Sequence, residues 1–262
     1  MSEVQGRSGG AMTPERRFGI AISVALILGG AYWALTNLTD EAKTTRDSYP
    51  VQGTSLTVVS KSSDIEVVAG DGPEIKVDRK FKKSVFGRNP DESYRDGTLE
   101  VKSSGCTFLS FGCDTDYVIT VPKDLVVSVD NTSGTIKVSD VAEVGTLKTT
   151  SGDIEVHAVG GEITLNATSG DIEGDALTAT KVNGKTTSGK VDLTFAAAPD
   201  EVRAQGTSGD VTVVVPEGTE TYKVDTDTSS GDEQAEVRTD PAATRTITAK
   251  TSSGDVTVEY AH

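Results

Sequence analysis

The chain has 262 residues, of which 35% are hydrophobic and 25% are charged, so it holds enough apolar side chains for one large or two small folded domains. Lys and Arg total 25 against 40 Asp and Glu, which gives a net charge of -15. Binding to a nucleic-acid backbone needs a cationic face, so this composition argues against a nucleic-acid partner.

An uncharged stretch near the N-terminus predicts a membrane helix. Residues 18–35 contain no charged side chain, and a helix of this length spans about 27 Å, close to the thickness of a hydrocarbon core. Arg16 and Arg17 precede the stretch, whereas Tyr32 and Trp33 lie near its end. This asymmetry matches the positive-inside rule and the interfacial aromatic belt, so we expect the N-terminus in the cytoplasm.

The prediction divides the chain into a short cytoplasmic tail at 1–17, a transmembrane helix at 18–36, a linker at 37–50 and an extracytoplasmic domain at 51–262. A cleaved signal peptide is the rival interpretation. Bulky Tyr32 and Trp33 stand where a cleavage site needs small residues, which favours an uncleaved single-pass anchor in the cell membrane.

The chain contains two cysteines, Cys106 and Cys113, separated by six residues. Such a pair usually forms a disulfide in an oxidising compartment, where the predicted helix places this segment. Two free buried thiols are the alternative.

A Ser-Gly turn recurs through the second half of the chain at spacings of 18, 18, 19, 20, 22 and 23 residues, at Gly134, Gly152, Gly170, Gly189, Gly209, Gly231 and Gly254. Apolar residues follow most of these glycines at the second and fourth positions and alternate with polar ones, as in Ile154-Glu155-Val156. This period of two is typical of a half-buried strand. A repeat this short, without a helix, predicts an all-β chain folded as a β-solenoid (parallel β-helix-like) with coils of 18–23 residues.

The repeated turn has a physical explanation. Gly has no Cβ and therefore tolerates the positive φ that a sharp corner requires. The adjacent Ser and Asp side chains can bond nearby backbone groups, as they do in Asx and Ser/Thr turns. Turn chemistry therefore explains the motif.

Two segments depart from the repeat. Glu233 follows Gly231 where an inward Ile or Val is expected, which predicts a bulge or a shift in register. An insertion is expected at about 70–128, and it carries a basic group made of Arg79, Lys80, Lys82, Lys83 and Arg88.

The motif T-S-G-D-[IV]-x-[VL], placed after an N-terminal membrane helix, resembles the bacterial "putative adhesin" family, a domain of unknown function on cell-surface proteins. The resemblance covers roughly Val51 to Tyr260. It implies a β-solenoid outside the membrane. It supplies no catalytic or binding residue, because the matching positions serve folding.

Candidate catalytic and metal-binding residues are few. His157 and His262 are the only histidines, and the strand alternation points His157 towards solvent. An acidic ladder with one residue in most coils is the best candidate for calcium, at Asp153, Asp171, Asp210, Asp232 and Asp255. Lys190 and Thr135 replace Asp in two coils, so we favour turn caps and expect neither a metal nor a cofactor.

The sequence therefore favours a non-catalytic, membrane-anchored envelope protein for adhesion, scaffolding or binding of an envelope protein or wall polymer. An accessory to an envelope-stress signalling system, acting through a membrane partner, is one alternative. A polysaccharide-active β-helix enzyme is another, although the basic insertion lacks a cluster of calcium ligands.

The last strand, with Val256 and Val258 inward, is expected to leave an unpaired edge for self-association or another envelope protein. Folding of Tyr260 over that end is the alternative.

Overall fold

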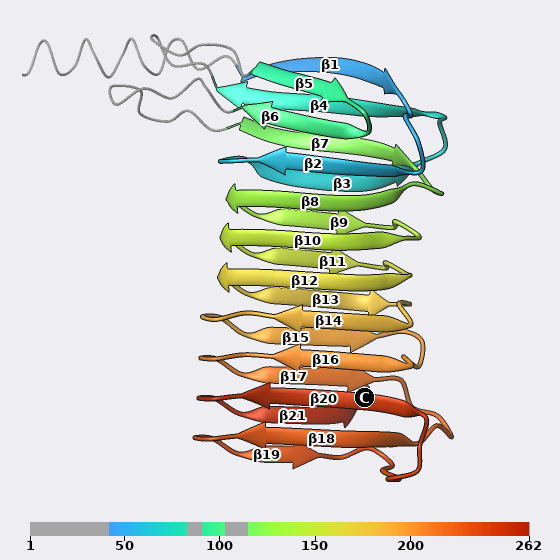
Figure 1. The fold of residues 1–262 in the computed structure, drawn as a ribbon, viewed down its shortest axis with the longest axis vertical. Helices are drawn as coiled ribbons and strands as arrows, with labels where there is room; N and C mark the ends of the chain where they lie inside the picture. The colour runs from blue at the N-terminus through green and yellow to red at the C-terminus, as the bar shows by residue number, and fades with distance from the viewer. Residues whose placement is uncertain (1–41, 83–90, 103–114, 262) are drawn as a thin grey trace, which may run out of the picture.

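A computed structural model describes residues 42–82, 91–102 and 115–261, which form 21 strands in two stacked sheets (Figure 1). Most neighbouring strands are parallel, so the all-β prediction is confirmed and the arrangement is consistent with a solenoid. No helix in the described part is long and apolar enough to cross a membrane. The predicted helix at 18–36 and both cysteines, Cys106 and Cys113, lie outside the described residues.

Sheet A has 11 strands, which lie side by side in the order β1 (Ala42–Pro50), β4 (Glu74–Lys82), β7 (Thr115–Pro122), β3 (Asp64–Gly70), β9 (Ile136–Ser139), β11 (Ile154–His157), β13 (Ile172–Leu177), β15 (Val191–Phe195), β17 (Val211–Val215), β21 (Val256–Tyr260) and β19 (Glu233–Ala235).

Sheet B has ten strands, in the order β18 (Tyr222–Thr228), β20 (Arg245–Thr251), β16 (Glu201–Gln205), β14 (Lys181–Lys185), β12 (Glu162–Ser169), β10 (Val144–Ser151), β8 (Val126–Ser133), β2 (Ser55–Ser60), β6 (Thr98–Lys102) and β5 (Asp91–Arg95).

We call a strand of sheet B and the strand of sheet A that follows it a coil, as in β10–β11. Equivalent residues stack from coil to coil, so that Ile154 pairs with Ile136 on one side and Ile172 on the other. These side chains are buried between the sheets and form one continuous core. The alternation predicted from the sequence therefore places the core as expected.

The seven repeat glycines lie at the corner between the two strands of a coil, and all have positive φ. Packing between the coils adds a second constraint to the positive φ. A Cβ on Gly170 would overlap the backbone carbonyl of Gly152 in the neighbouring coil, and the other six corners are equally crowded by the backbone of an adjacent coil. These corners therefore exclude side chains because of their backbone angle and because of the packing between coils.

The N-terminal end of the stack is antiparallel. Strand β1 pairs with β4, β4 pairs with β7, and β5 pairs with β6. The segment Ala42–Pro50, assigned to the linker from the sequence, is thus a strand of sheet A. The four strands β4 to β7, from the expected insertion, also belong to the two sheets.

The order of the coils in space differs from their order in the chain at the C-terminal end. The β20–β21 coil lies between β16–β17 and β18–β19. The expectation that the last strand, Val256–Tyr260, has an open edge is wrong, because β21 pairs with both β17 and β19. The Tyr260 hydroxyl accepts the Arg238 backbone N–H at 3.0 Å. Self-association through this end stays a prediction.

This order explains Glu233. The predicted bulge or register shift is wrong, because Glu233 pairs in register with Val256. Strand β19 is the edge of sheet A, so Glu233 occupies an inward position that no further coil covers. Its carboxylate accepts the Thr226 hydroxyl at 2.9 Å and the Thr228 backbone N–H at 3.2 Å. The last coil in space thus covers the core with polar groups beside Glu233 and with Tyr222 and Val224 further along β18.

Candidate functional site

The acidic ladder at the corners joins neighbouring coils. The Asp153 Oδ1 atom accepts the Asp171 backbone N–H at 2.9 Å, and Asp171 Oδ1 accepts the Lys190 N–H at 2.9 Å. Asp210 and Asp255 make equivalent bonds, each to the next coil in space. The carboxylates act as caps, although they bond the adjacent coil and not their own turn.

No group of three or more His, Cys, Asp or Glu residues that could hold a metal ion occurs in the described part of the chain.

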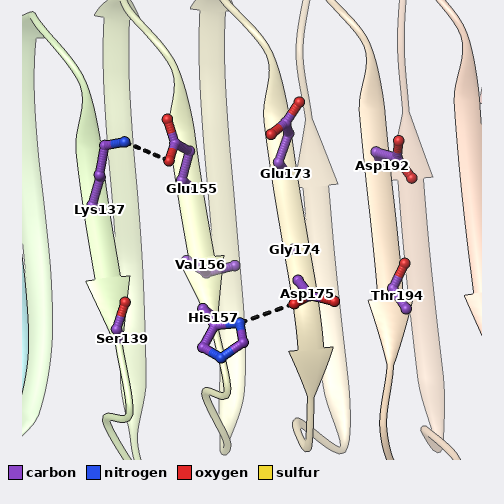
Figure 2. A pocket seen from close by; sticks show the side chains of 10 residues that line it. All are labelled: Lys137, Ser139, Glu155, Val156, His157, Glu173, Gly174, Asp175, Asp192 and Thr194. Carbon is purple, nitrogen blue, oxygen red and sulfur yellow. Dashed lines mark hydrogen bonds and ion pairs between the residues drawn. The ribbon is translucent and has the colours of Figure 1, made fainter.

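The outer face of sheet A is hollowed over β9, β11, β13 and β15, where a shallow groove of about 360 Å³ lies open to solvent (Figure 2). We call this feature the sheet A groove. Its polar lining forms two rows across the strands, Lys137-Glu155-Glu173-Asp192 and Ser139-His157-Asp175-Thr194. These residues occupy the outward positions of the repeat, so the alternation that buries Ile and Val also builds the groove.

Ion pairs between adjacent coils neutralise part of the groove. Lys137 Nζ donates to Glu155 Oε2 at 2.7 Å, and Lys190 Nζ lies 2.6 Å from Glu173 Oε1. These carboxylates raise the pKa of both lysines, chiefly through the hydrogen bond. Four carboxylates face one lysine in the lining, and Asp192 has no hydrogen bond or ion pair with any described side chain, so the groove is acidic.

Ser139, His157 and Asp175 lie on three adjacent strands in the order of a catalytic triad. His157 Nδ1 is 3.0 Å from Asp175 Oδ2, but the Ser139 side chain makes no hydrogen bond to His157. His157 and Asp175 are exposed, at 55% and 69% of their side-chain surface, as the sequence predicted for His157. A triad relies on a buried carboxylate and a Ser–His bond, so this arrangement is a polar contact at the surface and not a triad.

The model of one protein family, described as "Toastrack DUF4097", matches residues 54–260. The chain belongs to this family. The matched segment covers the coils, the acidic ladder and both rows of the groove, which therefore belong to its toastrack domain, whereas β1 precedes the matched residues. The family likeness inferred from the motif is thereby confirmed.

Solved structures resemble the toastrack domain distantly. A "putative adhesin" from Bacteroides fragilis is 14% identical over 84% of this chain and 97% of its own, with a TM-score of 0.46. A "putative lipid binding protein" from Parabacteroides distasonis is 12% identical over 85% and 98%, with a TM-score of 0.42. A "putative cell adhesion protein" from Clostridium sporogenes is 13% identical over 84% and 100%, with a TM-score of 0.34.

No curated relative matches the chain.

The basic group expected near residue 80 is not a surface patch where the structure describes it. Arg79 is 13% exposed and forms ion pairs with Asp47 and, at 3.2 Å, Glu92. The Tyr49 hydroxyl donates to Glu92 Oε1 at 2.6 Å. Burial and this bond raise the Tyr49 pKa. Arg79 therefore contributes to the packing of the N-terminal end.

Lys80 is exposed and lines a second, smaller groove of the toastrack domain. Lys83 and Arg88 lie outside the described residues, as does the side chain of Lys82.

Sequence analysis identified the acidic corner ladder but missed the sheet A groove. The signal was present, because Lys137, Glu155 and Glu173 recur at intervals of 18 residues. A repeat of 18 residues places such positions side by side, and an alternation of charge at that interval predicts ion pairs between coils.

Proposed function

We propose that this toastrack protein is a non-catalytic, membrane-anchored protein of the cell envelope. In this proposal the two-sheet domain lies outside the membrane and serves adhesion, scaffolding or partner binding through the sheet A groove. The observation that supports this choice of binding face is the excess of carboxylates over lysine in the groove lining, including Asp192, which forms no direct ion pair with a described base. The groove therefore suits a partner with cationic groups.

Sheet B provides a contrast that supports this choice of face. Most outward acids on its strands are matched with a base, as in Lys181–Glu162 at 2.6 Å and Arg203–Glu201 at 2.6 Å, and Asp227 on β18 is the exception among the described residues. Paired surface charges have little left to offer a partner, whereas an unmatched carboxylate gains from an incoming cation.

The pKa of Lys137 argues against a polysaccharide-active site in the sheet A groove. A lysine that removes a proton must be neutral at the working pH, which requires a lowered pKa. Glu155 raises the Lys137 pKa, so Lys137 stays protonated. A role in envelope-stress signalling would use the same face for a partner and is the second candidate function.

Reversal of the groove charges tests the binding face. We compare full chains that carry Glu155→Lys, Glu173→Lys and Asp192→Lys with matched chains that carry Asp130→Lys, Glu162→Lys and Glu201→Lys on sheet B. Each is incubated with isolated envelopes from cells that lack the protein. We expect the envelopes to retain at least about tenfold less of the groove variant than of the unchanged chain. The sheet B variant should be retained as well as the unchanged chain. Equal retention by both variants and the unchanged chain would contradict the proposal.

The topology is tested separately. Protease added to intact cells, after removal of any outer barrier, should degrade the toastrack domain. Protection of the domain until the membrane is permeabilised would place it in the cytoplasm and refute the extracytoplasmic assignment.

A further inference from the structure

The β20–β21 coil occupies a slot that the preceding part of the chain leaves open. After β17 the chain builds β18–β19 one position further along the stack, and then returns to fill the gap with β20–β21 (Figure 1). Removal of β20–β21 alone would leave two complete faces, one formed by β16 and β17 and the other by β18 and β19.

The slot fits its occupant closely on both sides. Strand β20 pairs in parallel with β16 over five residues and with β18 over seven, and β21 pairs with β17 over five and with β19 over three. The inward side chains Ile247, Val256 and Val258 are fully buried. The Thr251 hydroxyl donates to the Gly209 carbonyl at 3.0 Å, which adds a side-chain bond across one boundary.

The connection that leads from β19 into this coil lies mostly at the surface. Residues 236–244 link β19 to β20 and are exposed apart from Val237 and the half-buried Ala243. Their backbone groups bond to Tyr222 of β18, to β21 and within the segment, as in Tyr222 N–H to the Arg238 carbonyl at 3.0 Å and Glu236 N–H to the Val258 carbonyl at 2.7 Å. Within the described part of the chain, the coil can leave the slot by a change in this segment, whereas a coil such as β14–β15 is joined by the chain to the coils on both sides of it.

We propose that the slot also accepts the β20–β21 coil of a second copy, so that two chains exchange these coils. Every contact of the coil with its slot is the same in the closed and exchanged forms, which differ only in residues 236–244 and in the entropy of association. Exchange creates a dimer without any new complementary surface. The occupant is specified by the slot itself, since the repeat positions of β20–β21 satisfy the strands on both sides.

Cross-linking between positions 208 and 253 can detect the exchange. Ser208 and Ser253 occupy these positions. They pair as neighbours across the boundary between the coils β16–β17 and β20–β21, and both are exposed. Full chains labelled with nitrogen-15 and carrying Ser208→Cys are incubated with unlabelled full chains carrying Ser253→Cys, in detergent micelles. A short thiol cross-linker is then added, and cross-linked peptides are identified by mass spectrometry. A link between labelled position 208 and unlabelled position 253 can form only between chains.

The matched control uses Ser169→Cys and Ser188→Cys, a pair with the same bridge between coils that follow chain order. We expect the exchange pair to give at least about tenfold more inter-chain links than the control pair. A single chain with Ser208→Cys and Ser253→Cys must cross-link internally, which shows that the geometry permits the reaction. Inter-chain yields that are equal for both pairs, whether low or high, would overturn the proposal.

Discussion

Gly170 and Gly152 lie at the same corner of adjacent coils, so close that a Cβ on Gly170 would overlap the Gly152 carbonyl oxygen. The crowded atom belongs to the backbone and cannot rotate away. Gly170 also has a φ of 144°, which L side chains rarely adopt. The corner motif is therefore constrained within each coil and between coils.

We predict that Gly170→Ala destabilises the domain by at least about 3 kcal/mol, because backbone strain and overlap between coils add. Gly53→Ala is the control, since Gly53 has a φ of 82° but a Cβ at this position would meet no atom within 4 Å. It should cost about 1 kcal/mol. Urea unfolding of both variants measures the difference, and equal losses would show that overlap between coils is unimportant.

Asp171 should tolerate Asn but not Ala. Its Oδ1 atom accepts the Lys190 N–H at 2.9 Å, and an Asn carbonyl can accept the same bond. We expect Asp171→Asn to cost less than about 0.5 kcal/mol and Asp171→Ala about 1 kcal/mol. Thermal melts with and without calcium check this. A calcium-dependent loss in the Asn variant would instead identify the ladder as a metal site.

Loss of the hydroxyl group should change the stability of the domain in opposite directions at Tyr117 and Tyr49. The Tyr117 hydroxyl is buried and has no hydrogen-bond partner among the described residues, whereas the Tyr49 hydroxyl donates to Glu92. We predict that Tyr117→Phe stabilises by about 1 kcal/mol and that Tyr49→Phe destabilises by about 1 kcal/mol. Chemical unfolding at pH 7 measures both, and a loss in the Tyr117 variant would reveal a bond that the structure lacks.

The same residues predict an alkaline limit to stability. Burial raises the pKa of Tyr117 and of Tyr49 above the ordinary value. The folded state then holds these protons more tightly than the unfolded chain, so the free energy of unfolding falls as the pH rises above about 10. Tyr117→Phe should make this fall shallower in unfolding curves recorded from about pH 8 to about pH 12. An unchanged slope would contradict the assignment.

Ala158 and Ala176 offer stabilising substitutions at the corner opposite the glycines. Their φ angles are 50° and 51°, in the left-handed region. Replacement by Gly removes about 1–2 kcal/mol of strain, against about 0.5–1 kcal/mol of added chain entropy, so each should stabilise by about 0.5–1 kcal/mol. Ala142→Gly, at a nearby residue without positive φ, should destabilise. Melting temperatures that fall for all three would refute this account.

The sequence alone determined those features of the fold whose physical constraints act within a single coil. The alternation of apolar and polar side chains and the need for positive φ both act within a single coil. Inward residues such as Ile154 and corner glycines such as Gly170 could therefore be predicted from the sequence. The 18-residue interval also predicts that Lys137 lies beside Glu155, because coils of the same length place equivalent positions next to each other. These patterns determined an all-β repeat with one continuous core.

Tertiary structure alone decided the order of the coils. Each coil presents similar edges and similar Val and Ile positions, so no local signal specifies that β20–β21 enters between β17 and β19. For the same reason the sequence predicted a bulge or a register shift at Glu233, whereas the structure places Glu233 in register on the edge strand β19, at the end of the core. The convergence of Arg79, Tyr49 and Glu92 could not be predicted either, because β1 and β4 pair although β2 and β3 lie between them in the chain, and such pairing depends on contacts between distant parts of the chain.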